Sequence, residues 1–134
     1  MTGVIETALY VDDLPRSRQF YEQTLALEVL DATDRLCVLA AGGHDVLLLF
    51  HRGAMVDDLE TSGGVIPGHD GTGPLHVGLG VRAEDLEAWE ARLAADGVAI
   101  ESRVRWPLGG QSVYFRDPDG HLVELLTPGI WRVY

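Results

Sequence analysis

The sequence predicts an α+β fold made of two tandem βαβββ modules within one domain. Three observations support this prediction: the same order of elements occurs twice, the strands of the two halves can be aligned, and a glycine-rich stretch separates them. We place the first module at residues 3–53, the connecting loop at residues 54–73 and the second module at residues 74–134. A chain of 134 residues can bury one substantial core but not two independent ones.

The first module opens with a strand at residues 4–11, whose side chains alternate between two faces. Asp13 and Pro15 then predict the start of a helix, because aspartate caps free backbone N–H groups and proline fits a first helical turn. Residues at helical spacing carry this helix to about Leu25. Three further strands are expected at residues 28–30, 36–40 and 45–50.

The second module repeats this order, with a strand at residues 75–81, a helix from about residue 83, a strand at residues 98–104 and a hairpin at residues 111–126. The hairpin turns at Asp117-Pro118-Asp119-Gly120, where proline presets a turn φ and glycine takes a positive one. Residues 5–11 align with residues 75–81, and residues 46–50 align with residues 122–126. We interpret the chain as an internal duplication.

The connecting loop has no hydrophobic period and is rich in glycine. A loop of this length in a compact domain is either a functional lid or a linker. We expect its His69 end to fold over the functional site and to be ordered by ligand, while residues 57–62 stay mobile. His69 is a candidate acid or base, although an exposed loop histidine is the simpler interpretation.

Composition and charge limit the possible partners. The net charge of −11 argues against nucleic acid and anionic membrane surfaces, because both are polyanions. Cys37 is the single cysteine, so neither an internal disulfide nor a cysteine metal site is expected. The N-terminal residues lack a signal-peptide pattern and the apolar runs are too short to span a bilayer. We therefore expect a cytoplasmic protein.

Three side chains that can bind a metal occupy related strand positions. Glu6 and His76 align in the first strands of the two modules, each on the face opposite an apolar stripe and near a small residue. Glu124 lies between leucines in the last strand, where a buried carboxylate needs a partner. Each residue alone has a simpler explanation, as a hydrogen-bonded histidine or a solvated edge carboxylate. Together, matched by the duplication, they predict a metal site.

Two segments, residues 9–14 leading into Phe20-Tyr21 and residues 112–124, resemble the vicinal oxygen chelate superfamily. The resemblance covers nearly the whole chain and implies that the paired modules curl into a mixed-sheet cup around a divalent metal. By position it implies Glu6, His76 and Glu124 as ligands, with Glu6 where the family usually has His or Gln. Leu48 stands where glyoxalase I has a second glutamate and cannot bind a metal, so glyoxalase I itself is not expected.

The resemblance implies a metal-dependent enzyme that chelates a small substrate through vicinal oxygens. We also expect a homodimer, because each half presents a curled sheet that cannot close a barrel alone and two-fold symmetry is the commonest closed assembly. An isomerase, a lyase and a ring-opening dioxygenase are all compatible, with Glu6, Glu124 or His69 moving protons. The oxygen-rich ligand set favours Mn²⁺, Fe²⁺ or Mg²⁺, with Zn²⁺ or Ni²⁺ as further possibilities. The alternative is a non-catalytic drug- or metabolite-binding protein, as in the bleomycin-resistance branch, whose acidic charge would suit a cationic ligand.

Other side chains are candidates for substrate binding. Ser112, Tyr114 and Arg116 alternate onto one face of the hairpin, and in the fosfomycin-resistance enzymes a Ser and a Tyr at matching positions line the pocket. Tyr114 could donate a hydrogen bond to a substrate oxyanion, or simply pack across strands. Aromatic walls are expected from the following residues, for which core packing is the simpler alternative: Tyr10, Phe50, Trp106 and Trp131.

Overall fold

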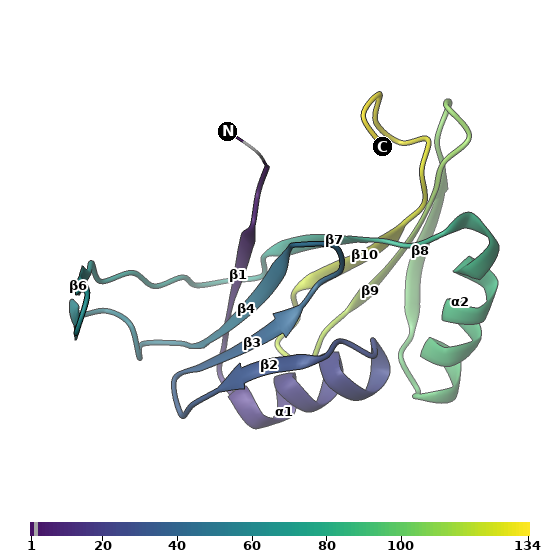
Figure 1. Cartoon of the computed structure of the whole chain (residues 1–134). Helices are drawn as coiled ribbons and strands as arrows, with labels where there is room; N and C mark the ends of the chain where they lie inside the picture. The colour runs from purple at the N-terminus through teal and green to yellow at the C-terminus, as the bar shows by residue number, and fades with distance from the viewer. Residues whose placement is uncertain (2) are drawn as a thin grey trace. The chain divides into compact units, whose positions relative to one another are not determined.

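The computed structural model describes Met1 and residues 3–134 and divides the chain into two compact units, Met1–Gly73 and Pro74–Tyr134. Figure 1 shows the two curled sheets and the helix that accompanies each of them. Both units have the order βαβββ, which confirms the predicted α+β fold of two repeated modules. No helix in this described part of the chain is both long and apolar enough to cross a membrane.

The first unit contains β1 (Glu6–Val11), α1 (Leu14–Gln19), the π-helical turn η1 (Phe20–Thr24), β2 (Val29–Ala32), β3 (Leu36–Ala40) and β4 (Val46–His51). Its sheet order is β1-β4-β3-β2, with β1 parallel to β4. Asp13 caps α1, since its side chain accepts a hydrogen bond from Arg16 N at 3.0 Å. The helix predicted to run to Leu25 is therefore a short α-helix that widens into a π-turn.

The second unit contains β7 (His76–Gly80), the 3₁₀ turn η2 (Ala83–Asp85), α2 (Leu86–Ala95), β8 (Ile100–Arg105), β9 (Gln111–Arg116) and β10 (Leu122–Leu126). Its order, β7-β10-β9-β8 with β7 parallel to β10, repeats the order of the first unit. Alternate residues of these strands, such as Val77, Phe115 and Val123, are buried in the core together with Leu86 and Leu93 of α2.

The β9–β10 turn is held by a buried carboxylate. Asp117 is 5% exposed, and its Oδ1 accepts hydrogen bonds from Asp119 N at 3.0 Å and His121 N at 2.8 Å. Gly120 takes the positive φ of 81° that the turn requires. His121 is completely buried, and its Nδ1 accepts a hydrogen bond from Leu75 N at 2.9 Å. The turn thereby ties the start of β10 to the start of β7.

The segment between the two modules is more ordered than its composition suggests. Residues 59–66, which include most of the stretch expected to be mobile, form a small hairpin of β5 (Leu59–Thr61) and β6 (Gly64–Ile66), visible in Figure 1. The sequence does not predict this hairpin, because strands of three residues are too short to show the alternation of apolar and polar side chains.

Residues 67–73, which we call the strap, are anchored to the first unit. His69 N donates to Met55 O at 2.6 Å, and the Tyr10 hydroxyl and His69 Nδ1 share a hydrogen bond of 2.8 Å. Arg52 Nε donates to Gly71 O at 3.2 Å, and any side chain at Gly71 would collide with the Tyr10 ring. His69 is therefore a half-buried, hydrogen-bonded residue rather than an exposed one.

Replacing Asp117 by alanine should lower the free energy of unfolding by about 2–4 kcal/mol, because two backbone N–H groups lose a carboxylate acceptor. Urea denaturation measures the change. Asp34→Ala, in the exposed turn between β2 and β3, is the matched control and should change stability by less than about 0.5 kcal/mol. Equal effects of the two substitutions would contradict this account of the turn.

The His69 amide should exchange slowly with solvent in the metal-free protein, because its hydrogen bond to Met55 is supported by the Tyr10 contact. Tyr10→Phe should speed this exchange by roughly five- to tenfold, whereas Tyr134→Phe, the same change in the second unit, should leave it unaltered. Amide-resolved hydrogen exchange measures both. Added protection of the strap with a metal and a substrate analogue would support a lid, and unchanged exchange would support a linker.

Candidate functional site

The sheet face of the second unit opposite its apolar core brings together four of the polar side chains proposed from the sequence: His76, Ser112, Tyr114 and Glu124. Because strand side chains alternate, the residues between the core positions of β7, β9 and β10 all lie on this opposite face. The strand register sets Leu122 beside His76, Glu124 between Gly78 and Tyr114, and Leu126 beside Ser112.

His76 and Glu124 form the centre of this face. His76 Nε2 lies 3.3 Å from Glu124 Oε2, with the carboxylate side chain 10% exposed and the imidazole 50% exposed. A Cβ atom at Gly78 would lie 3.7 Å from the same oxygen and only 2.9 Å from the Leu126 side chain. A side chain at Gly78 would therefore have to displace the Leu126 side chain, whereas its Cβ atom would only reach van der Waals contact with the carboxylate.

The hydrogen bonding of His76 suits a metal ligand. Its Nδ1 lies 3.1 Å from Leu122 O, a carbonyl that can only accept, so Nδ1 carries a proton. In the neutral ring Nε2 then directs its lone pair at Glu124 Oε2, and two lone pairs repel unless a proton or a cation lies between them. Imidazole nitrogen and carboxylate oxygen are ordinary ligands of divalent metals. The pair thus fits two positions of a metal site.

Tyr114 fixes the other oxygen of Glu124. Its hydroxyl donates to Oε1 at 2.8 Å, so the two carboxylate oxygens have different partners. Burial raises the pKa of Tyr114, and the hydrogen bond to Glu124 raises it further, while a hydrogen bond from Ser112 acts in the opposite direction. The phenol is therefore protonated at neutral pH and donates a hydrogen bond to Glu124.

Ser112 and Trp106 extend this arrangement. Ser112 is 1% exposed, and its Oγ accepts a hydrogen bond from Trp106 Nε1 at 2.8 Å. The sequence indicates Trp106 only as a possible aromatic wall. No local sequence pattern predicts a hydrogen bond between an indole and the hydroxyl six residues later, so this contact of Trp106 could not be found from the sequence.

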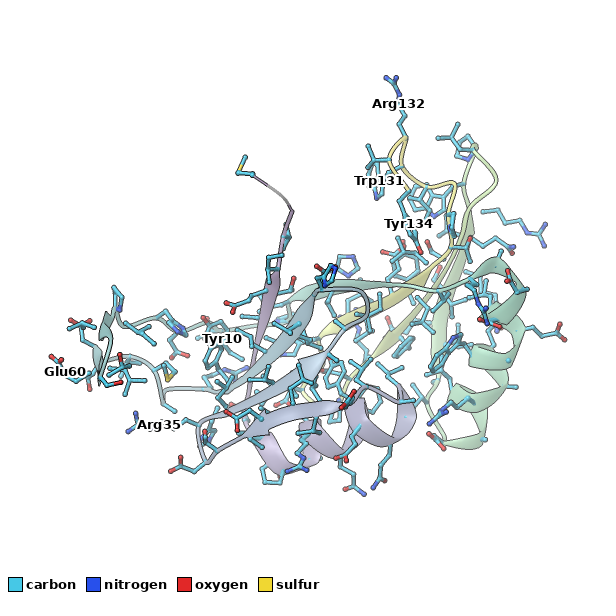
Figure 2. The ribbon with its side chains drawn as sticks, viewed as in Figure 1. Tyr10, Arg35, Glu60, Trp131, Arg132 and Tyr134 are labelled. Carbon is cyan, nitrogen blue, oxygen red and sulfur yellow. The ribbon has the colours of Figure 1, made fainter. Side chains whose placement is uncertain are left out.

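Arg116 does not join the group. Its Nε lies 3.2 Å from both carboxylate oxygens of Glu101, and its Nη1 donates to Gly120 O at 3.1 Å. These contacts connect β9 to β8 and to the β9–β10 turn, and substrate binding by Arg116 remains a prediction. Trp131, labelled in Figure 2, is 65% exposed near the C-terminus, and its place in a pocket wall remains a prediction.

The first unit holds the remaining candidates. Tyr10 and Phe50 stack with ring centroids 5.7 Å apart, and His69 meets Phe50 edge-on at 4.7 Å. Burial, followed by the charge of Asp70, raises the pKa of Tyr10. Glu6 is exposed at the start of β1, on the Tyr10 face of the strand. Among the residues that the structure describes, no third His, Cys, Asp or Glu groups with the His76–Glu124 pair, so Glu6 as a ligand remains a prediction.

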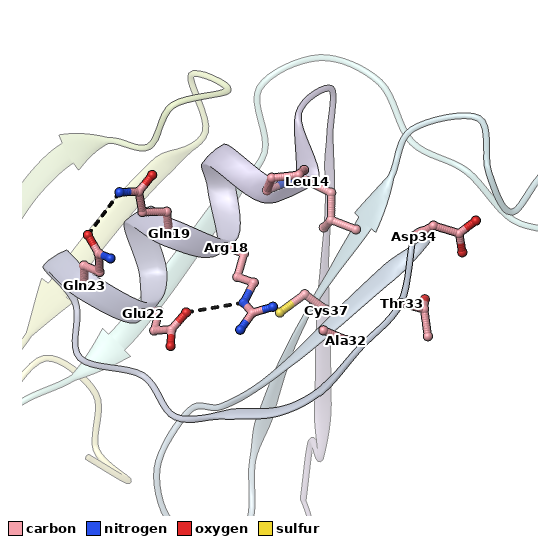
Figure 3. Close-up of a pocket in the computed structure, with 10 residues that line it drawn as sticks. Leu14, Arg18, Gln19, Glu22, Gln23, Ala32, Thr33, Asp34 and Cys37 are labelled. Atoms are coloured by element: carbon pink, nitrogen blue, oxygen red, sulfur yellow. Dashed lines mark hydrogen bonds and ion pairs between the residues drawn. The ribbon is translucent and has the colours of Figure 1, made fainter.

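A cavity of about 480 Å³ lies in the first unit beside α1 (Figure 3). It is lined by α1, η1 and the β2–β3 turn, and none of the residues proposed from the sequence contributes to it. Arg18 pairs with Glu22 at 3.3 Å and its guanidinium lies next to Cys37. Burial raises the pKa of the Cys37 thiol despite the opposing charge of Arg18, so the thiol is protonated and a poor nucleophile.

The chain matches one family model and is similar to several known proteins. The family model of the Glyoxalase/Bleomycin resistance protein/Dioxygenase superfamily matches residues 3–125. The chain is 28% identical to metallothiol transferase FosB of Bacillus licheniformis over 130 residues, which is 96% of this chain and 77% of that protein. It is 31% identical to catechol-2,3-dioxygenase of Bacillus subtilis over 118 residues, 87% of this chain but 38% of the dioxygenase.

Among solved structures, lactoylglutathione lyase from Agrobacterium tumefaciens matches with a TM-score of 0.88 and 30% identity, and the match covers 98% of each chain. The match spans both units and their common βαβββ order. The chain therefore belongs to the glyoxalase/bleomycin resistance protein/dioxygenase superfamily, the vicinal oxygen chelate superfamily that its sequence resembles.

Proposed function

We propose that this chain is a metal-dependent enzyme that acts on a small substrate held through two adjacent oxygen atoms. The main support for the proposal is that His76 Nε2 lies 3.3 Å from the nearly buried carboxylate of Glu124 in the second unit. The similar proteins are named as a thiol transferase, a dioxygenase and a lyase. They support enzyme chemistry of this type, and the proposed reaction is an isomerisation, a lyase reaction or a ring-opening dioxygenation.

The proposed ligands are Glu6, His76 and Glu124, one imidazole and two carboxylates. This set favours Mn²⁺, Fe²⁺ or Mg²⁺, with Zn²⁺ and Ni²⁺ as further candidates. A bound ion would act as a Lewis acid toward the substrate oxygens. Residues outside the ligand set would bind the substrate: Ser112, Tyr114, Arg116, Tyr10 and Phe50.

Four side chains are candidates for proton transfer: Glu6, Glu124, Tyr114 and His69. Glu6 is an exposed carboxylate, suited to take a proton from a substrate carbon. Tyr114 donates a hydrogen bond to Glu124 at 2.8 Å, and its hydroxyl could stabilise negative charge that develops on the substrate. His69, hydrogen-bonded to Tyr10, is a further candidate acid or base in the first unit.

Purified protein loaded with Mn²⁺ should contain about one ion per chain, and His76→Ala should weaken Mn²⁺ binding by at least roughly 100-fold. Elemental analysis gives the stoichiometry, and Mn²⁺ electron paramagnetic resonance gives the affinity. His51→Ala, an exposed histidine at the end of β4, is the matched control and should bind as the parent does. Equal affinity of His76→Ala and the parent would overturn the metal site.

Glu6→Gln tests the third ligand separately. Loss of the carboxylate charge should weaken Mn²⁺ binding at least tenfold, or about 1.4 kcal/mol, if Glu6 is a ligand. Parent-like affinity of Glu6→Gln together with weak binding by His76→Ala would keep the metal site and remove Glu6 from it.

We further propose a homodimer with two-fold symmetry, the commonest closed assembly. In the first unit the face of the sheet opposite α1 carries half-exposed apolar side chains, including Val38, Val46 and Leu48. Exposed apolar area of this kind marks interfaces. Light scattering at micromolar concentration should give twice the chain mass of 14.6 kDa. A mass of one chain would contradict the dimer.

The second candidate function is non-catalytic binding of a drug or metabolite, favoured by the cavity beside α1. Its volume of about 480 Å³ is in the range of small-molecule pockets, and Asp34 in its lining suits a cationic ligand. An apolar cation such as ethidium should then raise the melting temperature of chelator-treated protein, and Ala32→Trp, which fills the cavity, should abolish this shift. Ethidium stabilisation without Mn²⁺ binding would favour this alternative.

A further inference from the structure

We propose that Tyr134 is a specificity-determining residue, which closes one end of the candidate site and selects substrates by the length of an apolar group beside their chelating oxygens. Tyr134 belongs to residues 127–134, a segment after β10 that we call the return loop. The inference rests on the proposed function, because it assigns the kind of substrate that the same site would hold. The position of the Tyr134 ring can be tested without metal.

Tyr134 lies on the same sheet face as His76. Side chains alternate along β7, so a side chain at Gly80 would point to the face that carries His76 and Gly78. A Cβ atom at Gly80 would lie 2.5 Å from the Tyr134 hydroxyl oxygen and 3.0 Å from Cζ of its ring. The phenol therefore occupies the space that a side chain at Gly80 would need.

Backbone hydrogen bonds hold the return loop in this place. Gly129 O accepts from Gly110 N at 3.1 Å, and Gly129 N donates to Tyr134 O at 2.9 Å. Tyr134 N donates to Trp131 O at 3.1 Å, and Figure 2 labels both residues. These contacts close the return loop on itself and tie it to the turn between β8 and β9.

The Tyr134 hydroxyl already has a partner within the protein. It donates to Leu126 O at 3.3 Å, a carbonyl that also accepts from Val81 N at 2.9 Å. Burial raises the pKa of Tyr134, so the phenol is uncharged at neutral pH. The side chain is nevertheless 41% exposed. A substrate on this face would therefore meet an uncharged aromatic ring.

Leu126 fills the face between Tyr134 and the Glu124 carboxylate. It pairs with Gly80 and lies two residues along β10 from Glu124. Its half-buried side chain extends over Gly78, where a Cβ atom would lie 2.9 Å from it. Residues two apart in a strand are separated by about 6.5 Å. An apolar surface of about that length thus leads from the carboxylate to the Tyr134 ring.

Trp106 bounds this surface on its other side. Its Nε1 donates to Ser112 Oγ at 2.8 Å, and Ser112 is the β9 neighbour of Leu126. The half-buried indole is therefore across Leu126 from Tyr134. We call Leu126, Trp106 and Tyr134 the apolar subsite. Two aromatic side chains beside a leucine suit a short alkyl chain or a similar uncharged group on the substrate.

A series of alkyl hydroxamates tests the selection by length, because a hydroxamate binds a metal through two adjacent oxygens. Hexanohydroxamate should bind the Mn²⁺-loaded protein roughly tenfold more tightly than acetohydroxamate, and octanohydroxamate should gain nothing further, since Tyr134 blocks it. Tyr134→Ala should bind octanohydroxamate roughly fivefold more tightly than the parent does. Tyr134→Phe keeps the ring and should match the parent. Isothermal titration calorimetry measures these affinities.

Trp131→Ala is the matched control, because it removes an aromatic side chain of the same loop that is 65% exposed. It should keep the parent's order of hydroxamate affinities. Equal octanohydroxamate affinity of Tyr134→Ala and the parent, with Mn²⁺ still bound, would overturn the inference and keep the metal site. An equal gain in Tyr134→Ala and Tyr134→Phe would also contradict it, since that result indicates a loosened loop rather than a removed wall.

Nuclear magnetic resonance of chelator-treated protein tests the apolar subsite without metal. A nuclear Overhauser contact should join the Gly80 α-protons to the Tyr134 ring, and millimolar hexanol should shift the Trp106 indole and Leu126 methyl resonances. Absence of the contact, or hexanol shifts only at other residues, would refute the apolar subsite. A protein that binds no Mn²⁺ but gives both results would refute the proposed function and retain the apolar subsite.

Discussion

The pairing of β10 between β7 and β9 is the constraint on which the candidate site depends. Parallel pairing with β7 sets Leu122 beside His76, and antiparallel pairing with β9 sets Glu124 beside Tyr114. Because side chains alternate along each strand, this register carries all three polar groups onto one face and the valines and leucines between them into the core. A slip of one residue would turn the Glu124 carboxylate into the apolar core, at the cost of an unpaired buried charge.

The turn that precedes β10 protects this register. Asp117 accepts two backbone hydrogen bonds, and the buried His121 accepts a third from the residue that leads into β7. The same short stretch therefore closes the β9–β10 hairpin and aligns β10 with its parallel neighbour. Stability and site geometry are coupled here, since both depend on where the first residue of β10 is held.

The two modules share a topology but differ in the side chains on the sheet face opposite the apolar core. The second has the hydrogen-bonded pairs Trp106–Ser112 and Tyr114–Glu124, with His76 beside Glu124. The first has apolar side chains, the Glu6 carboxylate and the aromatic cluster of Tyr10, Phe50 and His69. The core positions of both modules remain apolar. After a duplication, the core must keep its packing in both copies, while the exposed face is free to take on different chemistry.

The sequence by itself determined the two βαβββ modules, the helix cap at Asp13, the turn at Gly120, and which polar residues share a strand face. Each of these depends on neighbours within a few positions, through alternation, capping or turn geometry. Only the tertiary structure decided the His76–Glu124 distance, the Trp106–Ser112 hydrogen bond, the ion pair of Arg116 with Glu101, and the anchoring of His69 on Tyr10. These contacts join side chains from different elements or across a turn. They depend on strand register and side-chain rotamers, which only the packed fold specifies.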